Sequence, residues 1–166
     1  MLPLVIAASL TAAGCGTAAK HHGAAGSAID LTDRFEPVLP LAPGNFERHL
    51  PVVRKGQRRD ALVLVAPAAM RASLQGVTGK MKLEGMATPV FNIGDGIQMD
   101  VFLAGNGTRD LAGSLYFDAA RKAADRDWIP IEIPLEPGGR DSLEIRVSAG
   151  PRGDLVADWL ALSSLR

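Results

Sequence analysis

Hydrophobic and polar residues alternate along most of the chain from Ile29 onward, and this alternation predicts β-strands. The clearest runs are residues 97–103 and 142–148, in which every second side chain is hydrophobic. A period of two places those side chains on one face of a strand, so we expect both runs to be half-buried strands. Shorter runs predict further strands at residues 35–39, 61–66, 81–85, 111–117 and 155–162.

The run 128–135 predicts a strand at the edge of a sheet. Its isoleucines alternate with Pro130 and Pro134, which share the opposite face. Proline has no backbone N–H, so a strand with prolines on one side is expected at an edge. Residues 118–126 are expected to form either a short helix capped by Asp118 or a loop.

Turn residues separate the predicted strands and indicate the fold class. Gly and Pro, with Asn and Asp, gather at residues 94–96, 105–107, 137–139 and 150–153, and the chain holds 18 glycines and 11 prolines. Eight or more short strands without a long helical period predict an all-β fold, an antiparallel β-sandwich with jelly-roll topology. The 166 residues leave room for one domain, which we place at residues 29–166.

The amino-terminal stretch is typical of an export signal. Residues 1–19 contain no charged side chain, and small residues lead from the hydrophobic segment 2–8 to Cys15, the single cysteine. Ala13, Gly14 and Cys15 resemble the lipobox of bacterial lipoproteins, in which the cysteine is acylated and becomes the new amino terminus. The stretch departs from that pattern at Ala12, where leucine is usual, and in lacking a basic n-region.

The lipobox resemblance implies a location as well as a cleavage site. It implies a signal peptide at residues 1–14, lipidation at Cys15, and a lipid anchor that holds the protein on the extracytoplasmic side of the cell envelope. In a cell with two membranes, Gly16 after the cysteine implies the outer membrane. The alternative is an uncleaved signal anchor, because 19 uncharged residues approach the length of a membrane span.

Residues 15–28 are rich in Gly, Ala, Ser and Thr, which predicts a flexible tether between the anchor and the domain. His21 and His22 lie in this segment without further metal ligands nearby.

Charge and residue types exclude several functions. The 18 basic and 18 acidic residues balance, whereas a nucleic-acid-binding protein needs a basic surface. Five cations gather at Arg48, Arg54, Lys55, Arg58 and Arg59. We expect these residues to form a solvated connection between strands, with contact to anionic lipid headgroups or an acidic partner as the alternative.

His49 is the single histidine of the domain and no nucleophile motif accompanies it, so we expect no catalytic activity.

The turns predict where a ligand would bind. Because consecutive strands run antiparallel, alternate turns lie at the same end of a sandwich. One end is expected to gather the side chains of Asp95, Asp125, Arg126, Asp127, Arg152 and Asp154. Carboxylates with an arginine can bind sugar hydroxyls or a hard cation such as calcium, although turns also favour Asp for its backbone preferences alone. Trp128 is expected either to stack on a ligand as an exposed residue or to pack under a loop.

The carboxy-terminal half resembles a known family. The segments that carry the resemblance are Gly94-Asp95-Gly96-Ile97, residues 124–130 (ADRDWIP), residues 137–139 (PGG), residues 143–147 (LEIRV), Gly150-Pro151 and Asp158-Trp159. Their order resembles the galactose-binding-like jelly roll of carbohydrate-binding modules and envelope proteins, from about residue 35 onward. The resemblance implies a non-catalytic binding module for a glycan, without a cofactor. Members of the family often carry a structural calcium, but no residues of this sequence are assigned as its ligands. The alternative is a structural or assembly subunit that binds an envelope protein.

Overall fold

The computed structural model describes residues 28, 30–38, 45–153 and 157–166. The predicted signal peptide, Cys15, the tether up to residue 27 and Asp154 lie outside the described residues. None of the helical segments found in the described part of the chain is long and hydrophobic enough to cross a membrane.

Ten strands and one short 3-10 helix follow one another along the described chain. The strands are β1 (Glu36–Pro37), β2 (Phe46–Arg54), β3 (Gln57–Val65), β4 (Ala68–Ser73), β5 (Met81–Pro89), β6 (Ile97–Gly105), β7 (Thr108–Phe117), β8 (Ile129–Leu135), β9 (Ser142–Ala149) and β10 (Trp159–Ser163). The helix η1 (Ala123–Arg126) lies between β7 and β8. Residues 118–126 are therefore mostly a loop, one of the two expected forms.

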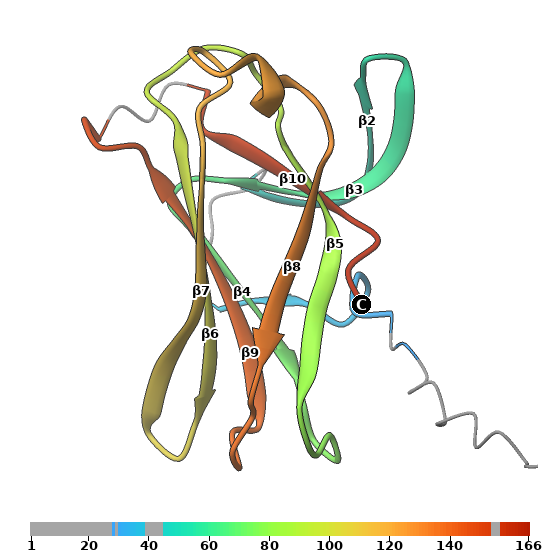
Figure 1. The fold of residues 1–166 in the computed structure, drawn as a ribbon, viewed down its shortest axis with the longest axis vertical. Coiled ribbons are helices and arrows are strands. Elements are labelled where there is room, and N and C mark those ends of the chain that lie inside the picture. Colours follow the sequence, from blue (N-terminus) through green and yellow to red (C-terminus); the bar gives the residue numbers. More distant parts are fainter. Residues whose placement is uncertain (1–27, 29, 39–44, 154–156) are drawn as a thin grey trace, which may run out of the picture.

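The strands form two antiparallel sheets, which confirms the predicted β-sandwich. The first sheet has the strand order β1-β4-β9-β6-β7, and the second sheet has the order β2-β3-β10-β5-β8. Figure 1 shows the two sheets facing each other, with the tip of the β2–β3 hairpin standing beside the upper part of the sandwich. β8 lies at the edge of the second sheet, as its prolines predicted.

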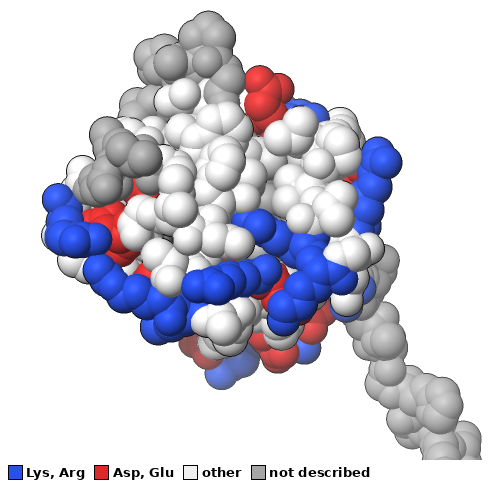
Figure 2. Space-filling model, turned by 90° about the horizontal axis from the view of Figure 1, so that it is seen from above, with Lys and Arg blue, Asp and Glu red and all other residues white. Residues whose placement is uncertain are grey.

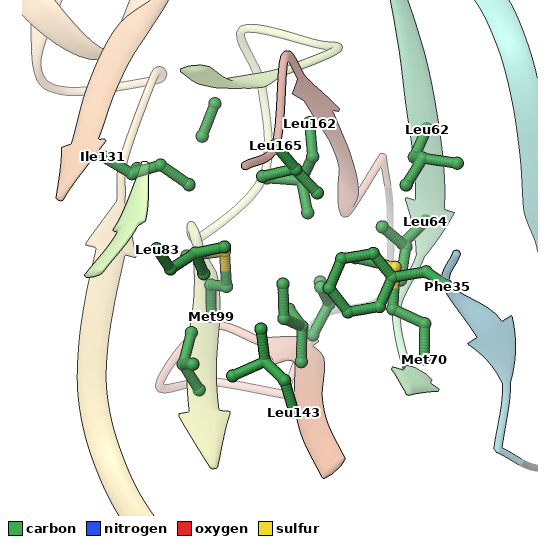
Figure 3. Close-up of a cluster of buried hydrophobic side chains, with 14 of the residues drawn as sticks. Phe35, Leu62, Leu64, Met70, Leu83, Met99, Ile131, Leu143, Leu162 and Leu165 are labelled. Carbon is green, nitrogen blue, oxygen red and sulfur yellow. The ribbon is translucent and has the colours of Figure 1, made fainter. Parts of the chain in front are cut away.

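The core fills the space between the two sheets. Alternate residues of β6 and β9 point inward, and Met99, Leu143 and Ile145 are fully buried there. Leu62 and Leu64 of β3 meet them from the second sheet, as Figure 3 shows for several of these side chains. A separate outer cluster covers the opposite face of the second sheet. Its buried members are Val52, Ala61, Val63, Trp128 and Ala161.

Two strands, β2 and β4, were not predicted, and one expectation about the five cations was wrong. Arg48 and Arg54 lie in β2, and Arg58 and Arg59 lie in β3, so the five cations form a β-hairpin rather than a connection between strands. Val52 of β2 and Ala61 of β3 are buried in the outer cluster together with Trp128, which comes from a distant part of the sequence. β4, with the sequence AAMRAS, begins with three consecutive apolar residues and so shows no clear alternation.

Candidate functional site

The predicted gathering of turns at one end of the sandwich is confirmed. The Cα atoms of Ile97 and Ala149 are paired across β6 and β9, and Ile97 also pairs with Phe117 of β7. The turns next to these residues therefore lie together, at the top of Figure 1. We call this the turn end; it comprises residues 90–96, 118–128 and 150–153 with the tip of the β2–β3 hairpin.

Asp95 and Arg152 meet across two turns at the centre of this end. The Asp95 side chain is only 1% exposed, and its Oδ2 accepts a hydrogen bond of 2.6 Å from the backbone N–H of Arg152. The Nε atom of Arg152 lies 3.9 Å from the same oxygen, and its side chain is 66% exposed. Oδ1 of Asp95 is buried without a hydrogen-bond partner. Arg152 thus offers exposed N–H donors, and Asp95 has one buried carboxylate oxygen that can still accept a hydrogen bond.

Close backbone packing fixes the position of Asp95. The hydroxyl of Tyr116 donates a hydrogen bond of 2.5 Å to the Asp95 carbonyl. A Cβ atom at Gly150 would collide with that same carbonyl group, so only glycine fits there. Burial, together with the charge of Asp118, raises the pKa of Tyr116, and the hydroxyl therefore stays a neutral donor.

Asp125 and Arg126 hold the loop between β7 and β8 in shape. Oδ2 of Asp125 accepts a hydrogen bond of 2.6 Å from the backbone N–H of Asp118. The guanidinium group of Arg126 donates to the carbonyls of Ala119 and Ala120, at 2.7 and 3.0 Å. Both predicted site residues are thus engaged within their own loop.

Asp127 and Trp128 contact the β2–β3 hairpin instead of Asp95. Oδ2 of Asp127 lies 3.1 Å from Nζ of Lys55, and this contact, with the backbone N–H of Trp128, lowers the pKa of Asp127. Trp128 is buried, and its indole Nε1 lies 3.3 Å from the carbonyl oxygen of Gln57. The guanidinium group of Arg59 covers its ring at 5.7 Å. Trp128 therefore packs under the hairpin, and the alternative of an exposed stacking residue is wrong.

The exposed aromatic residue of this end is Phe91, which sequence reasoning missed. Phe91 is 40% exposed, and its ring stands edge-on against the ring of Trp159, with 5.5 Å between the ring centroids. Trp159 is partly buried, at the margin of the outer cluster. Ile93, two residues further on, is 60% exposed. Phe91 lies between a strand and a turn, so no alternation marks it in the sequence.

The charge presented by the turn end differs from the expected carboxylate cluster. Asp95, Asp118 and Asp158 are buried. The exposed charges of this end are mainly cations, from Lys55, Arg58, Arg121, Lys122, Arg126 and Arg152. Figure 2, seen from above this end, shows lysine and arginine side chains in a band beside uncharged surface. Within the described ranges, no three metal-ligating side chains come together.

Comparisons with known proteins agree with the fold. No protein-family model and no curated protein matches the sequence. Solved structures that resemble it include jelly-roll domains of carbohydrate-binding modules. The CBM51 of Clostridium perfringens GH95, solved in complex with methyl-galactose, is 13% identical with a TM-score of 0.54, over 82% of this chain and 97% of that chain.

Two further structures show the same architecture. The CBM51-2 and INT domains of Clostridium perfringens ZmpB are 7% identical with a TM-score of 0.58, and the match covers 82% of this chain and 30% of that chain. The CBM22-1 xylan-binding domain of Paenibacillus barcinonensis Xyn10C is 12% identical with a TM-score of 0.50, over 81% and 84%. At such identities the likeness establishes the galactose-binding-like β-sandwich fold.

Proposed function

We propose that the domain is a non-catalytic glycan-binding module whose ligand contacts the turn end. The observation that carries the proposal is the exposed ring of Phe91, supported from behind by Trp159. An aromatic face offers an apolar surface for the C–H groups of a sugar ring, and a supporting ring holds it at low entropic cost.

Polar groups of the same end of the sandwich suit the hydroxyls of a sugar. Arg152 places its exposed guanidinium donors two turns away, next to the buried carboxylate of Asp95. Asn92 is exposed directly after Phe91 and supplies both a donor and an acceptor. A small number of fixed polar groups around an apolar surface is the usual composition of a ligand site.

The sequence supports a lipid-anchored location for this module. In this proposal Cys15 carries the lipid, residues 16–28 form the tether, and the domain lies on the extracytoplasmic side of the envelope. The test is the mass of the amino-terminal peptide of protein purified from its native membrane. The proposal requires a chain that begins at an acylated Cys15, and a chain that keeps Met1 with a free thiol contradicts it.

Glycan binding is tested with the full mature chain on an array of plant, animal and bacterial oligosaccharides, followed by calorimetry with the strongest ligand. We expect Phe91→Ala and Arg152→Gln to weaken binding at least about tenfold each, the loss typical of one well-placed contact. The control is Glu136→Gln, because Glu136 is 70% exposed and follows the end of β8 that lies away from the turn end. Absence of binding to every glycan, or equal binding by Phe91→Ala, contradicts the proposal.

An assembly subunit is the second candidate, because the exposed Phe91 and Ile93 would also suit a protein partner. Cross-linking in intact cells, followed by purification through a tag after Arg166, separates the two functions. Recovery of one envelope protein that is lost with Phe91→Ala favours assembly. Recovery of the chain alone, together with glycan binding, favours the module.

A further inference from the structure

A buried carboxylate on the outer face of the first sheet holds three arginines. Glu144 lies in β9, the middle strand of that sheet, and points outward because its neighbours Leu143 and Ile145 point into the core. Its side chain is nevertheless fully covered, with an exposed fraction of 0%. The cover consists of guanidinium groups at 2.7, 3.2 and 2.5 Å from its oxygens, contributed by Arg71, Arg109 and Arg146.

The four side chains together carry an excess of positive charge. Three guanidinium groups and one carboxylate give a formal charge of +2. The arginine side chains are 48%, 41% and 41% exposed, and each uses one nitrogen in its contact with Glu144. Since a guanidinium group has five N–H donors in a fixed fork, each arginine keeps donors that reach the solvent. Such an excess is suited to a second oxyanion supplied from outside.

An aromatic ring holds two of these arginines in place. The guanidinium groups of Arg109 and Arg146 lie 4.8 and 5.9 Å from the centroid of the Phe102 ring. Phe102 is the cross-strand partner of Glu144, so ring and carboxylate lie side by side on the sheet. Contacts with a ring and with a buried carboxylate both restrict the arginines before any ligand arrives, which lowers the entropic cost of binding.

Open space and hydroxyl-binding groups adjoin the arginines. A shallow hollow of about 530 Å³ is lined by Arg71, Arg109 and Glu144, by residues of the β6–β7 turn, and by Ser142 and the exposed acidic residue Asp141 at the start of β9. On the other side of Arg146 lies Asp100, its cross-strand partner, whose Oδ1 binds Ser114 at 2.6 Å and Gln98 at 2.8 Å. Donors and acceptors thus continue along β6 and β7 from the cationic cluster.

We infer that the outer face of the first sheet binds an acidic glycan, with its carboxylate or sulfate group on Arg71, Arg109 and Arg146. The inference takes its ligand class from the proposed function and adds a second site, away from Phe91. The acidic group would receive bidentate hydrogen bonds from the guanidinium forks, and neighbouring sugar hydroxyls would bind the polar groups around Asp100. A membrane of anionic lipids fits this face less well, because Asp100 would repel its headgroups whereas it can accept bonds from hydroxyls.

The test compares oligosaccharides of matched length by calorimetry at low salt, using the full mature chain. The probes are a galacturonate pentamer, a sulfated galactan oligomer and a neutral galactose pentamer. We expect at least one acidic oligomer to bind about tenfold or more tightly than the neutral one, with an affinity that falls as salt rises. The two acidic probes distinguish a carboxylate from a sulfate ligand.

Variants locate the site on the sheet. Arg109→Gln is expected to remove most of the preference for the acidic oligomer, and Arg109→Lys to keep part of it, since lysine retains the charge but not the bidentate fork. The matched control is Arg166→Gln, because Arg166 is 58% exposed and pairs with Glu84 on the second sheet. Melting curves of all variants establish that they are folded.

The results separate this inference from the proposed function. Loss of acidic-glycan binding in Arg109→Gln, with retention in Phe91→Ala, supports a second site on the first sheet. Loss in Phe91→Ala alone supports the turn end and overturns the inference. Equal binding of acidic and neutral oligomers overturns it too, and so does binding to anionic vesicles without binding to either acidic oligomer.

Discussion

Replacing Glu144 with glutamine tests how much the arginine cluster contributes to stability. Glutamine keeps the volume of the side chain but removes the charge that three guanidinium groups contact at 2.5–3.2 Å. Removing one partner of a buried ion pair costs about 3–5 kcal/mol when the other charge is left buried. Here the arginines are 41–48% exposed and can be hydrated, so we expect a smaller loss of about 2–3 kcal/mol in the free energy of unfolding.

The pH dependence of this loss follows from the pKa of Glu144. Burial raises this pKa, but the contacts with Arg71 and Arg146 outweigh burial and hold it below its ordinary value. A carboxyl whose pKa is lower in the folded state stabilises the fold at pH values above its unfolded pKa. That stabilisation disappears as the pH falls through the folded pKa. The difference between the wild type and Glu144→Gln should therefore be full at neutral pH and shrink below about pH 4.

Urea unfolding followed by tryptophan fluorescence, between pH 3 and pH 7, measures this difference. The control is Glu136→Gln, which removes an exposed ion pair with Lys80 and should leave the unfolding midpoint unchanged. The reasoning is refuted if Glu144→Gln unfolds at the same urea concentration as the wild type at neutral pH, or if the difference grows in acid.

Two further predictions concern the core and the turn end. Leu62→Ala should lower the free energy of unfolding by about 2–5 kcal/mol, because Leu62 is fully buried. Leu111→Ala, at an exposed position, should change it by less than about 0.5 kcal/mol. Denaturant unfolding of both variants checks this, and similar losses in the two variants would contradict it. Gly150→Ala should cost about 1–3 kcal/mol, because its Cβ would collide with the backbone of Asp95. The same variant should weaken glycan binding by moving Asp95 away from Arg152, and unchanged melting and binding would show that the turn tolerates a side chain.

Much of the fold could be predicted from the sequence, because strands with one buried face leave a period of two. The alternation of β6, β8 and β9 survives in the sequence since their outward residues face solvent or other polar groups. β2 was not predicted, and only the second half of β3 was. Their hairpin packs against Trp128, which lies 71 residues after Gln57, and its arginines conceal the alternation.

For the candidate site at the turn end, the sequence predicts the location but not the contacts of the individual side chains. Antiparallel order brings the turns of Asp95 and Arg152 together, and the structure confirms that meeting. Asp125, Arg126 and Asp127 have local partners, which depend on loop backbone that no period describes. The three arginines around Glu144 come from β4, β7 and β9, so their convergence requires the strand order of the first sheet.

The most direct test of glycan binding at the turn end uses the two tryptophan indole N–H signals in a nuclear magnetic resonance titration. Trp159 supports Phe91 at the proposed contact, while Trp128 is buried under the hairpin and donates to Gln57. Titration of the mature chain with the strongest glycan from the array should shift the Trp159 signal and leave the Trp128 signal in place. A bound glycan that shifts neither signal, or only that of Trp128, would contradict binding at the turn end.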